Sequence, residues 1–280
     1  METSDSKTEF EVVSQIPPDA KATAMTDAPS KPDHLTDEQN EQRLALRREL
    51  LEIIATHQEG FDSGTPESAR IDAIIDELEP LTFYPDAMNF PDVFRGHWSG
   101  DYYNIGRLIG GKGAHNKGRG VTTSLKVWSM GRLPDIPSQF LGSGLEINPD
   151  TGEYNFFSHF TIGEKAVPAY HFAFAKYRTV AEEMDRFFVD FDKFKIVPAD
   201  HDMTMEEFVE ETGLGSMDNV EAKIETPPKL WSRVPYMDDE MRVQLGKLGG
   251  HYILFKTDRP MYSIEYWKDK TIAPPSMAAE

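Results

Sequence analysis

The feature that most constrains this chain is a two-residue alternation of side-chain types through its middle. In residues 170–175, aromatic residues alternate with histidine and alanine. Successive side chains of a strand point to opposite faces, so this pattern is typical of a β-strand with two different faces. The same period places further large apolar side chains on shared strand faces, among them Tyr154, Phe156, Phe160, Phe187, Val189 and Phe191.

Short segments of this kind, separated by Gly, Pro and Asn turns, continue towards the C-terminus. We expect strands around Val127 and Trp128 and at residues 241–243, 251–255 and 262–267, with one short acidic helix at Met205–Thr212. This order of elements favours an antiparallel barrel or sandwich over a parallel α/β sheet.

A different period precedes the strands. Leucines and isoleucines between residues 44 and 54 recur at helical spacing before Gly60. Thr65 and Pro66 then form an N-terminal helix signal, isoleucines follow at helical spacing, and Pro80 ends the segment. We therefore predict an N-terminal helical hairpin, with one apolar face on each helix.

The domain organisation follows from composition. Residues 1–40 mix Pro, Ala, Ser and Thr with acidic residues and show no sustained periodicity, which predicts a disordered acidic tail. The strands and the hairpin form one domain over residues 41–270, and residues 271–280 form a second tail.

Charge and cysteine content exclude several classes of function. The chain carries a formal charge of −19, so its surface repels a phosphate backbone and we expect no nucleic-acid partner. It contains no cysteine, which excludes disulfides, thiolate metal sites and cysteine nucleophiles. We also expect no membrane-spanning helix and no secretory signal. No transit peptide is visible, although a mature form whose transit peptide has been removed would look the same.

One glycine-rich segment is similar to a phosphate-binding loop but lacks its chemistry. The segment 106–113 ends in Lys112 and Gly113, whereas a phosphate loop needs Ser or Thr after the lysine. We interpret residues 104–120 as a hairpin loop, a basic island on an acidic protein. It could contact anionic lipid headgroups or an acidic partner through its four cations, Arg107, Lys112, Lys117 and Arg119.

No motif indicates catalysis or metal binding. None of the eight histidines pairs with another at metal-ligand spacing, and no nucleophile elbow is present. His201 and Asp202 could contribute ligands only to a site assembled in three dimensions. We therefore predict no catalytic residues, no metal and no obligatory cofactor.

Several segments resemble known protein families. Gly96-His-Trp98 is a G-x-W arrangement similar to that of lipocalins, whose early tryptophan packs against a late arginine; Arg242 is the candidate partner. The segments 50–60, 71–79, 96–98, 236–243 and 249–256 together resemble the plastid lipid-associated (PAP/fibrillin) family. The chain departs from the family pattern at Ser99–Tyr103, at Leu245 and in the 104–126 insertion, so it resembles a divergent member.

The resemblance implies a mostly β fold, namely a lipocalin-like antiparallel β-barrel behind the helical hairpin. It also implies binding, sequestration or coating of a carotenoid, quinone or other lipid at a thylakoid or lipid-globule surface, in a plastid or a cyanobacterium. The candidate cavity wall is Trp98, Phe156, Tyr170, Phe172 and Phe174. Asp239 and Arg242 are the candidate polar groups near one end of the barrel.

Three interpretations remain open at this point. The aromatic side chains could wall a ligand cavity, or they could equally fill a solid core. On the same barrel the chain could be a bilin lyase-like enzyme that loads a chromophore. As a structural subunit it would instead bind a protein complex through its tail and basic loop.

Overall fold

The structure is a computed structural model, and it describes residues 33–56, 65–104, 122–247 and 251–258. Two helices come first, α1 (Asp37–Thr56) and α2 (Pro66–Leu78), and they contact each other. Thr65 caps α2 by accepting a hydrogen bond from the Ser68 amide, as its position before Pro66 predicts. Helix α1 begins at Asp37, so the last four residues of the predicted tail are helical.

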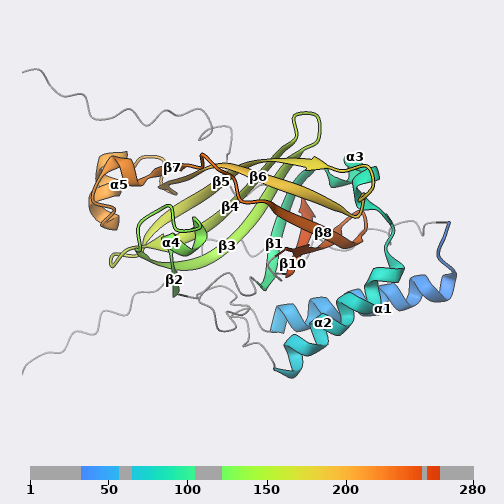
Figure 1. Cartoon of the computed structure of the whole chain (residues 1–280). Coiled ribbons are helices and arrows are strands. Elements are labelled where there is room, and N and C mark those ends of the chain that lie inside the picture. The colour runs from blue at the N-terminus through green and yellow to red at the C-terminus, as the bar shows by residue number, and fades with distance from the viewer. Residues whose placement is uncertain (1–32, 57–64, 105–121, 248–250, 259–280) are drawn as a thin grey trace, which may run out of the picture. The chain divides into compact units, whose positions relative to one another are not determined.

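Eight antiparallel strands form a closed ring, in the order β1-β10-β9-β8-β6-β5-β4-β3 and back to β1 (Figure 1). Their bounds are β1 Gly96–Asn104, β3 Pro137–Asn148, β4 Glu153–Ile162, β5 Val167–Thr179, β6 Arg186–Pro198, β8 Leu230–Met237, β9 Met241–Gly246 and β10 His251–Thr257. Two short strands lie outside the ring: β2 (Thr122–Ser124) pairs with β3, and β7 (Glu221–Lys223) pairs with β6. The predicted β-barrel behind two helices is confirmed.

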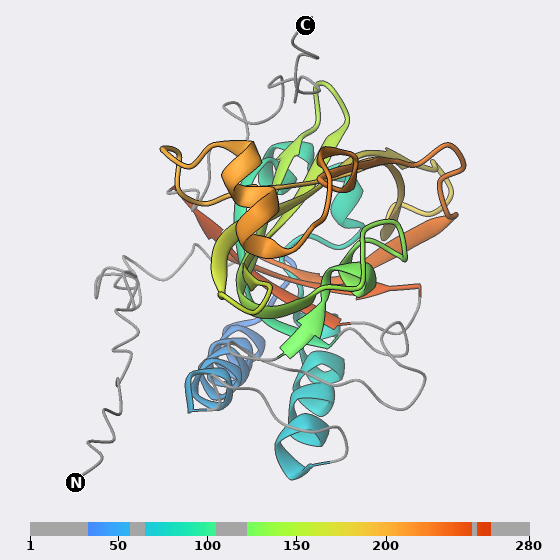
Figure 2. The ribbon, with the colours of Figure 1, turned by 90° about the vertical axis from the view of Figure 1, so that its left-hand side faces the viewer.

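Short helices lie at the two ends of the barrel (Figures 1 and 2). Helix α3 (Pro91–Phe94) is at one end, and α4 (Leu125–Trp128) and α5 (Met205–Thr212) are at the other. The bounds of α5 match the prediction, and Thr204 and Glu207 form its capping box. The predicted strand at Val127–Trp128 is wrong, because Ser124 caps a helical turn there by accepting from the Lys126 amide.

Closure of the barrel depends on the pairing of β1 with β3, which runs from Gly96 opposite Ile147 to Gly100 opposite Ser143. Gly144 lies within this pairing, opposite Ser99. A Cβ atom at Gly144 would lie 2.6 Å from the Trp98 carbonyl oxygen and would also overlap the Phe157 ring. Glycine is therefore required where these two strands and Phe157 come together.

The strand register assigns each side chain to the inside or the outside of the ring. Trp98, Leu145, Phe156, Ala173 and Phe194 pair in turn across β1, β3, β4, β5 and β6, so they share one face. Trp98 and Leu145 form one cluster with residues from β4, β5, β6, β8 and β10. Side chains from so many strands of the ring meet only in its interior, so this face points inward.

Helices α1 and α2 cover part of the outside, over β8, β9 and β10. Their buried leucines and isoleucines pack in one cluster with strand residues Tyr236, Met241, Val243 and Ile253. This apolar contact gives both helices the buried face that their sequence period predicted.

A buried ion cluster joins α1 to the β8–β9 turn. Asp238 Oδ2 lies 3.1 Å from Arg43 Nη1 and 3.1 Å from Arg47 Nη1, and all three side chains are at most 5% exposed. The Tyr236 hydroxyl donates to the same oxygen at 2.5 Å; burial raises the pKa of Tyr236 and keeps it protonated. Asp238 Oδ1 accepts from the Glu240 and Met241 amides at 2.9 and 2.7 Å. One carboxylate therefore fixes both the turn and the helix.

Replacing Asp238 with Asn should destabilise the protein strongly. The change leaves two buried guanidinium groups without their shared counter-charge, and breaking a buried ion pair in this way costs about 3–5 kcal/mol. Denaturant unfolding of the variant measures the loss. Asp92→Asn, at a side chain that is 92% exposed, is the control and should change stability by less than about 0.5 kcal/mol. Equal stability of the two variants would contradict the role given to Asp238.

Candidate functional site

The barrel interior divides into two hydrophobic clusters. One, which we call the closed end, packs under α3 and includes Phe94, Trp98 and Met237. The other, which we call the helical end, includes Phe140 and Phe160 and packs against side chains of α4 and α5. Both clusters contact the same three side chains in the middle of the barrel: Phe156, Phe191 and Tyr252.

At the closed end, Arg242 lies between two aromatic rings. Its Cζ is 4.4 Å from the Phe94 ring centroid and 4.5 Å from that of Trp98. The Trp98 indole nitrogen donates to the Phe94 carbonyl at 3.0 Å. The predicted contact of Trp98 with Arg242 is therefore confirmed, and α3 adds a second ring to it.

Arg242 is fully buried, and none of its three guanidinium nitrogens has a hydrogen-bond partner within the described residues. Burial lowers the pKa of Arg242 to about 10, and the nearby hydroxyls of Tyr154 and Tyr177 only partly offset this. Asp239 does not join Arg242. It lies in the β8–β9 turn, where its carboxylate accepts a hydrogen bond from the Tyr84 hydroxyl.

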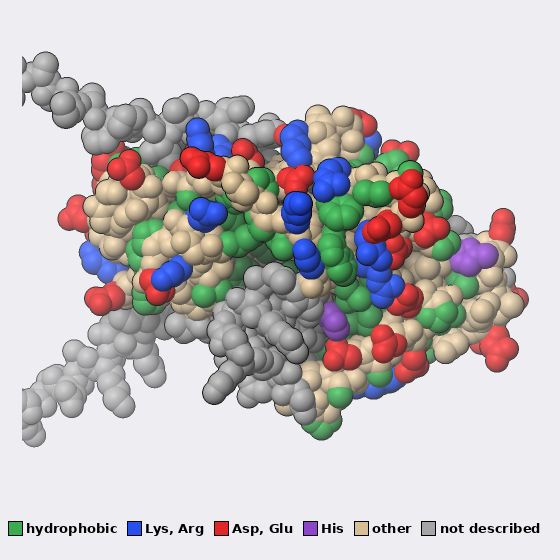
Figure 3. All heavy atoms as spheres, in the orientation of Figure 1, with side chains coloured by type: hydrophobic (Ala, Val, Ile, Leu, Met, Phe, Trp, Pro, Cys, Tyr) green, Lys and Arg blue, Asp and Glu red, His purple; other side chains and the backbone are tan. Residues whose placement is uncertain are grey.

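The middle of the barrel is the candidate site. Phe156, Phe191 and Tyr252 point inward from three different strands, yet each remains partly exposed. The next inward residues on the same strands, Ser158, Phe194 and Leu254, are at most 1% exposed. Partial exposure of rings inside a barrel means that the described side chains leave space there. A hollow with hydrophobic walls is visible on the face shown in Figure 3.

The side chains around this space are large rings and small residues. The Trp128 ring, on α4, is stacked with Phe140 at 5.2 Å and with Phe156 at 6.5 Å between centroids. On β5 the inward side chains include Ala169, Ala173 and Ala175, which are small. Alanines on one strand leave room for rings from its neighbours, or for a bound molecule.

The other predicted wall residues require a correction. Tyr170, Phe172 and Phe174 share their face of β5 with exposed Lys176 and Arg178 and oppose the inward alanines, so they lie outside the ring. They form a separate outer cluster with Phe157 and Val197. Alternation shows that β5 has two faces but not which one points inward, and here the small residues do. Of the five predicted wall residues, only Trp98 and Phe156 line the interior.

Sequence reasoning missed Phe191, Tyr252 and His171 as site residues. The alternation on β6 does indicate that Phe187, Val189 and Phe191 share a face. Nothing in the local pattern marks Tyr252, because its position follows from the pairing of β10 with β9. The predicted basic loop, with Arg107, Lys112, Lys117 and Arg119, lies outside the described residues.

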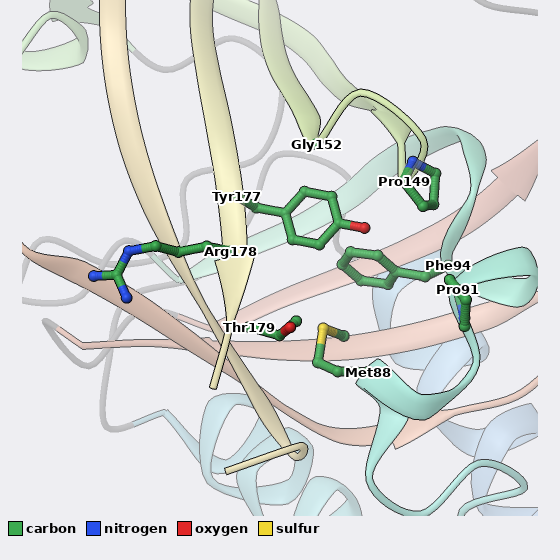
Figure 4. Close-up of a pocket in the computed structure, with 8 residues that line it drawn as sticks. All are labelled: Met88, Pro91, Phe94, Pro149, Gly152, Tyr177, Arg178 and Thr179. Carbon is green, nitrogen blue, oxygen red and sulfur yellow. The ribbon is translucent and has the colours of Figure 1, made fainter. Parts of the chain in front are cut away.

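A second hollow lies at the rim, beside α3 and the β3–β4 turn (Figure 4). Its volume is about 250 Å³, and it opens to solvent. Tyr177 and Phe94 face one another in it with ring centroids 5.6 Å apart, while Arg178 points away. Its remaining lining residues are Met88, Pro91, Pro149, Gly152 and Thr179. Phe94 also covers Arg242, so this shallow hollow lies on the outer side of the closed end.

Two other kinds of site are absent from the described part of the chain. No helix there is both long and apolar enough to cross a membrane. No group of three or more His, Asp or Glu side chains there is placed to hold a metal ion.

His171 predicts a measurable pH dependence of stability. Burial lowers the pKa of His171 to about 3, whereas an unfolded chain has a histidine pKa near 6.5. Between these values the unfolded state binds the additional proton, so acidification from pH 6.5 towards pH 3 destabilises the folded state. From pH 7 to pH 4 the loss due to His171 is about 3 kcal/mol.

Urea unfolding at several pH values tests this. His171→Phe should flatten the profile between pH 6.5 and 4, while Ser158→Ala, at the neighbouring position on β4, should leave its shape unchanged. A His171→Phe profile parallel to that of the unchanged protein would show that this histidine does not titrate as a buried group.

No protein-family model matches the chain, and no curated protein matches it either.

Proposed function

We propose that this protein binds a lipophilic small molecule in the middle of its barrel. The observation that carries the proposal is the partial exposure of Phe156, Phe191 and Tyr252, three rings that point inward between two buried clusters. An eight-stranded barrel is just wide enough to be filled by its own side chains or to hold one small ligand. Space beside inward rings favours the second use.

The chemistry of the wall suits an apolar guest. The two clusters that flank the site are built from aromatic and aliphatic side chains. Among the described residues, Arg242 is the one buried cation inside the barrel; it is enclosed by Phe94 and Trp98 and has no exposed surface. Burial of apolar ligand surface is therefore the main driving force expected for binding.

The finer identity of the ligand comes from the family resemblance. The PAP/fibrillin pattern suggests a carotenoid, a quinone or another lipid, held at a thylakoid or lipid-globule surface of a plastid or cyanobacterium. The Trp98–Arg242 contact supports the lipocalin-like part of this resemblance, because it was expected from the G-x-W segment. On this proposal the protein sequesters or carries its lipophilic ligand, or coats a lipid surface, and it catalyses no reaction.

Filling the site should abolish binding. Ala173 points inward between Phe156 and Phe194 and is 2% exposed, so Ala173→Leu adds volume beside the candidate space. We expect the affinity for the neutral fluorescent probe N-phenyl-1-naphthylamine to fall by about tenfold or more, as the added side chain competes with the probe. Fluorescence titration of protein freed of bound lipid measures this.

The control is Ala181→Leu, the same change at an exposed position between β5 and β6, which should bind the probe normally. Thermal melting of both variants shows whether they are folded. Organic extraction of the freshly purified protein identifies any resident molecule. Absence of both an extractable lipophile and probe binding would refute the proposal.

A further inference from the structure

A row of polar side chains crosses the inner wall of the barrel. Gly100 on β1 pairs with Ser143 on β3, Ser143 pairs with Ser158 on β4, and Ser158 pairs with His171 on β5. Directly paired residues share a face, so Ser143, Ser158 and His171 lie side by side on the inward face. We call these three side chains the polar row.

The polar row lies between apolar rows. On one side of it Leu145, Phe156 and Ala173 pair across the same three strands. Towards the helical end, Phe140 pairs with Phe160. The polar row is therefore next to Phe156, one of the three partly exposed rings of the candidate site.

The polar atoms of this row are buried and unsatisfied. His171 and Ser158 are 0% exposed and Ser143 is 1% exposed. Among the described residues, neither serine hydroxyl and neither ring nitrogen of His171 has a hydrogen-bond partner. The His171 ring instead stacks on Phe194, with centroids 5.5 Å apart, and makes a T-shaped contact with Phe160. A buried polar group without a partner destabilises a fold, so three adjacent ones need an explanation.

The chemistry of the row is that of a neutral hydrogen-bond donor. Without a charged partner His171 stays uncharged, so one ring nitrogen donates and the other accepts. Each serine hydroxyl can rotate to donate. No cation is part of the row, so an ionised ligand group would remain uncompensated there. A carbonyl oxygen accepts such hydrogen bonds and carries no charge.

We propose that the polar row recognises an uncharged carbonyl oxygen on an otherwise apolar ligand, bound with its apolar body against Phe156. The inference rests on the proposed function and gives it chemical selectivity. An apolar wall binds any hydrocarbon of suitable shape, whereas unpaired buried donors favour the ligand that satisfies them.

A matched pair of probes tests this on the full chain. 2-Acetylnaphthalene and 2-ethylnaphthalene share a ring system and differ in one position, a carbonyl oxygen against two hydrogens. Competition against N-phenyl-1-naphthylamine gives both affinities. We expect the acetyl compound to bind about tenfold more tightly to the unchanged protein, the size of one well-formed hydrogen bond.

Variants of the row should remove this preference. Ser158→Ala and His171→Phe should each lower the affinity for the acetyl compound by several-fold and leave the affinity for the ethyl compound almost unchanged. Ser232→Ala is the control, because Ser232 also points inward but already accepts a hydrogen bond from Gln244 Nε2 at 3.0 Å. It should keep the preference. The small Ser158→Ala change keeps the test valid if His171→Phe fails to fold.

The outcomes separate the two proposals. Equal affinity of the unchanged protein for both compounds overturns the role of the polar row while ligand binding stands. The role of the polar row is also overturned if Ser158→Ala and His171→Phe keep the preference for the acetyl compound and melt at higher temperatures. The row would then serve the fold itself or hold a buried water molecule. Failure of both compounds to displace bound N-phenyl-1-naphthylamine overturns the role of the polar row while ligand binding stands. Absence of N-phenyl-1-naphthylamine binding and of any extractable lipophile overturns the proposed function and the inference together.

Discussion

The pairing of β1 with β3 is the constraint on which the rest of the structure depends. Without it the strands would form an open curved sheet; with it they form a ring that has an inside. The pairing brings Trp98 over Leu145, and Gly144 lets the Trp98 carbonyl and the Phe157 ring approach the same point. Closure then decides, through the two-residue period of each strand, which side chains meet in the interior.

The two ends of this interior are sealed by different chemistry. Stacking of Arg242 between Phe94 and Trp98 closes one end with a cation, and apolar packing against α4 and α5 covers the other. The Asp238 cluster lies outside the ring and holds α1 against β8 and β9. The middle of the barrel, with its partly exposed rings, is therefore bounded by packed side chains at both ends, which is the arrangement that a preformed ligand site requires.

Much of the fold could be predicted from the sequence, because hydrophobic period and capping residues are local signals. The helical pattern, the Thr65 cap, α5 and most strands follow from such signals. The contact of Trp98 with Arg242 was predicted from the similarity of the G-x-W segment to lipocalins, although the two residues are 144 positions apart in the sequence. The site was predicted less well. The outward direction of Tyr170, Phe172 and Phe174 depends on how β5 pairs with β4 and β6, and the position of Tyr252 depends on β9; both are properties of the closed ring.

The central claim is that the middle of the barrel contains space for an apolar guest. Apolar cavities bind xenon, so a crystal pressurised with xenon tests the claim without any choice of ligand. The claim predicts a xenon peak in contact with Phe156, Phe191 and Tyr252. A well-ordered interior with these three rings packed together and no xenon between them would contradict it.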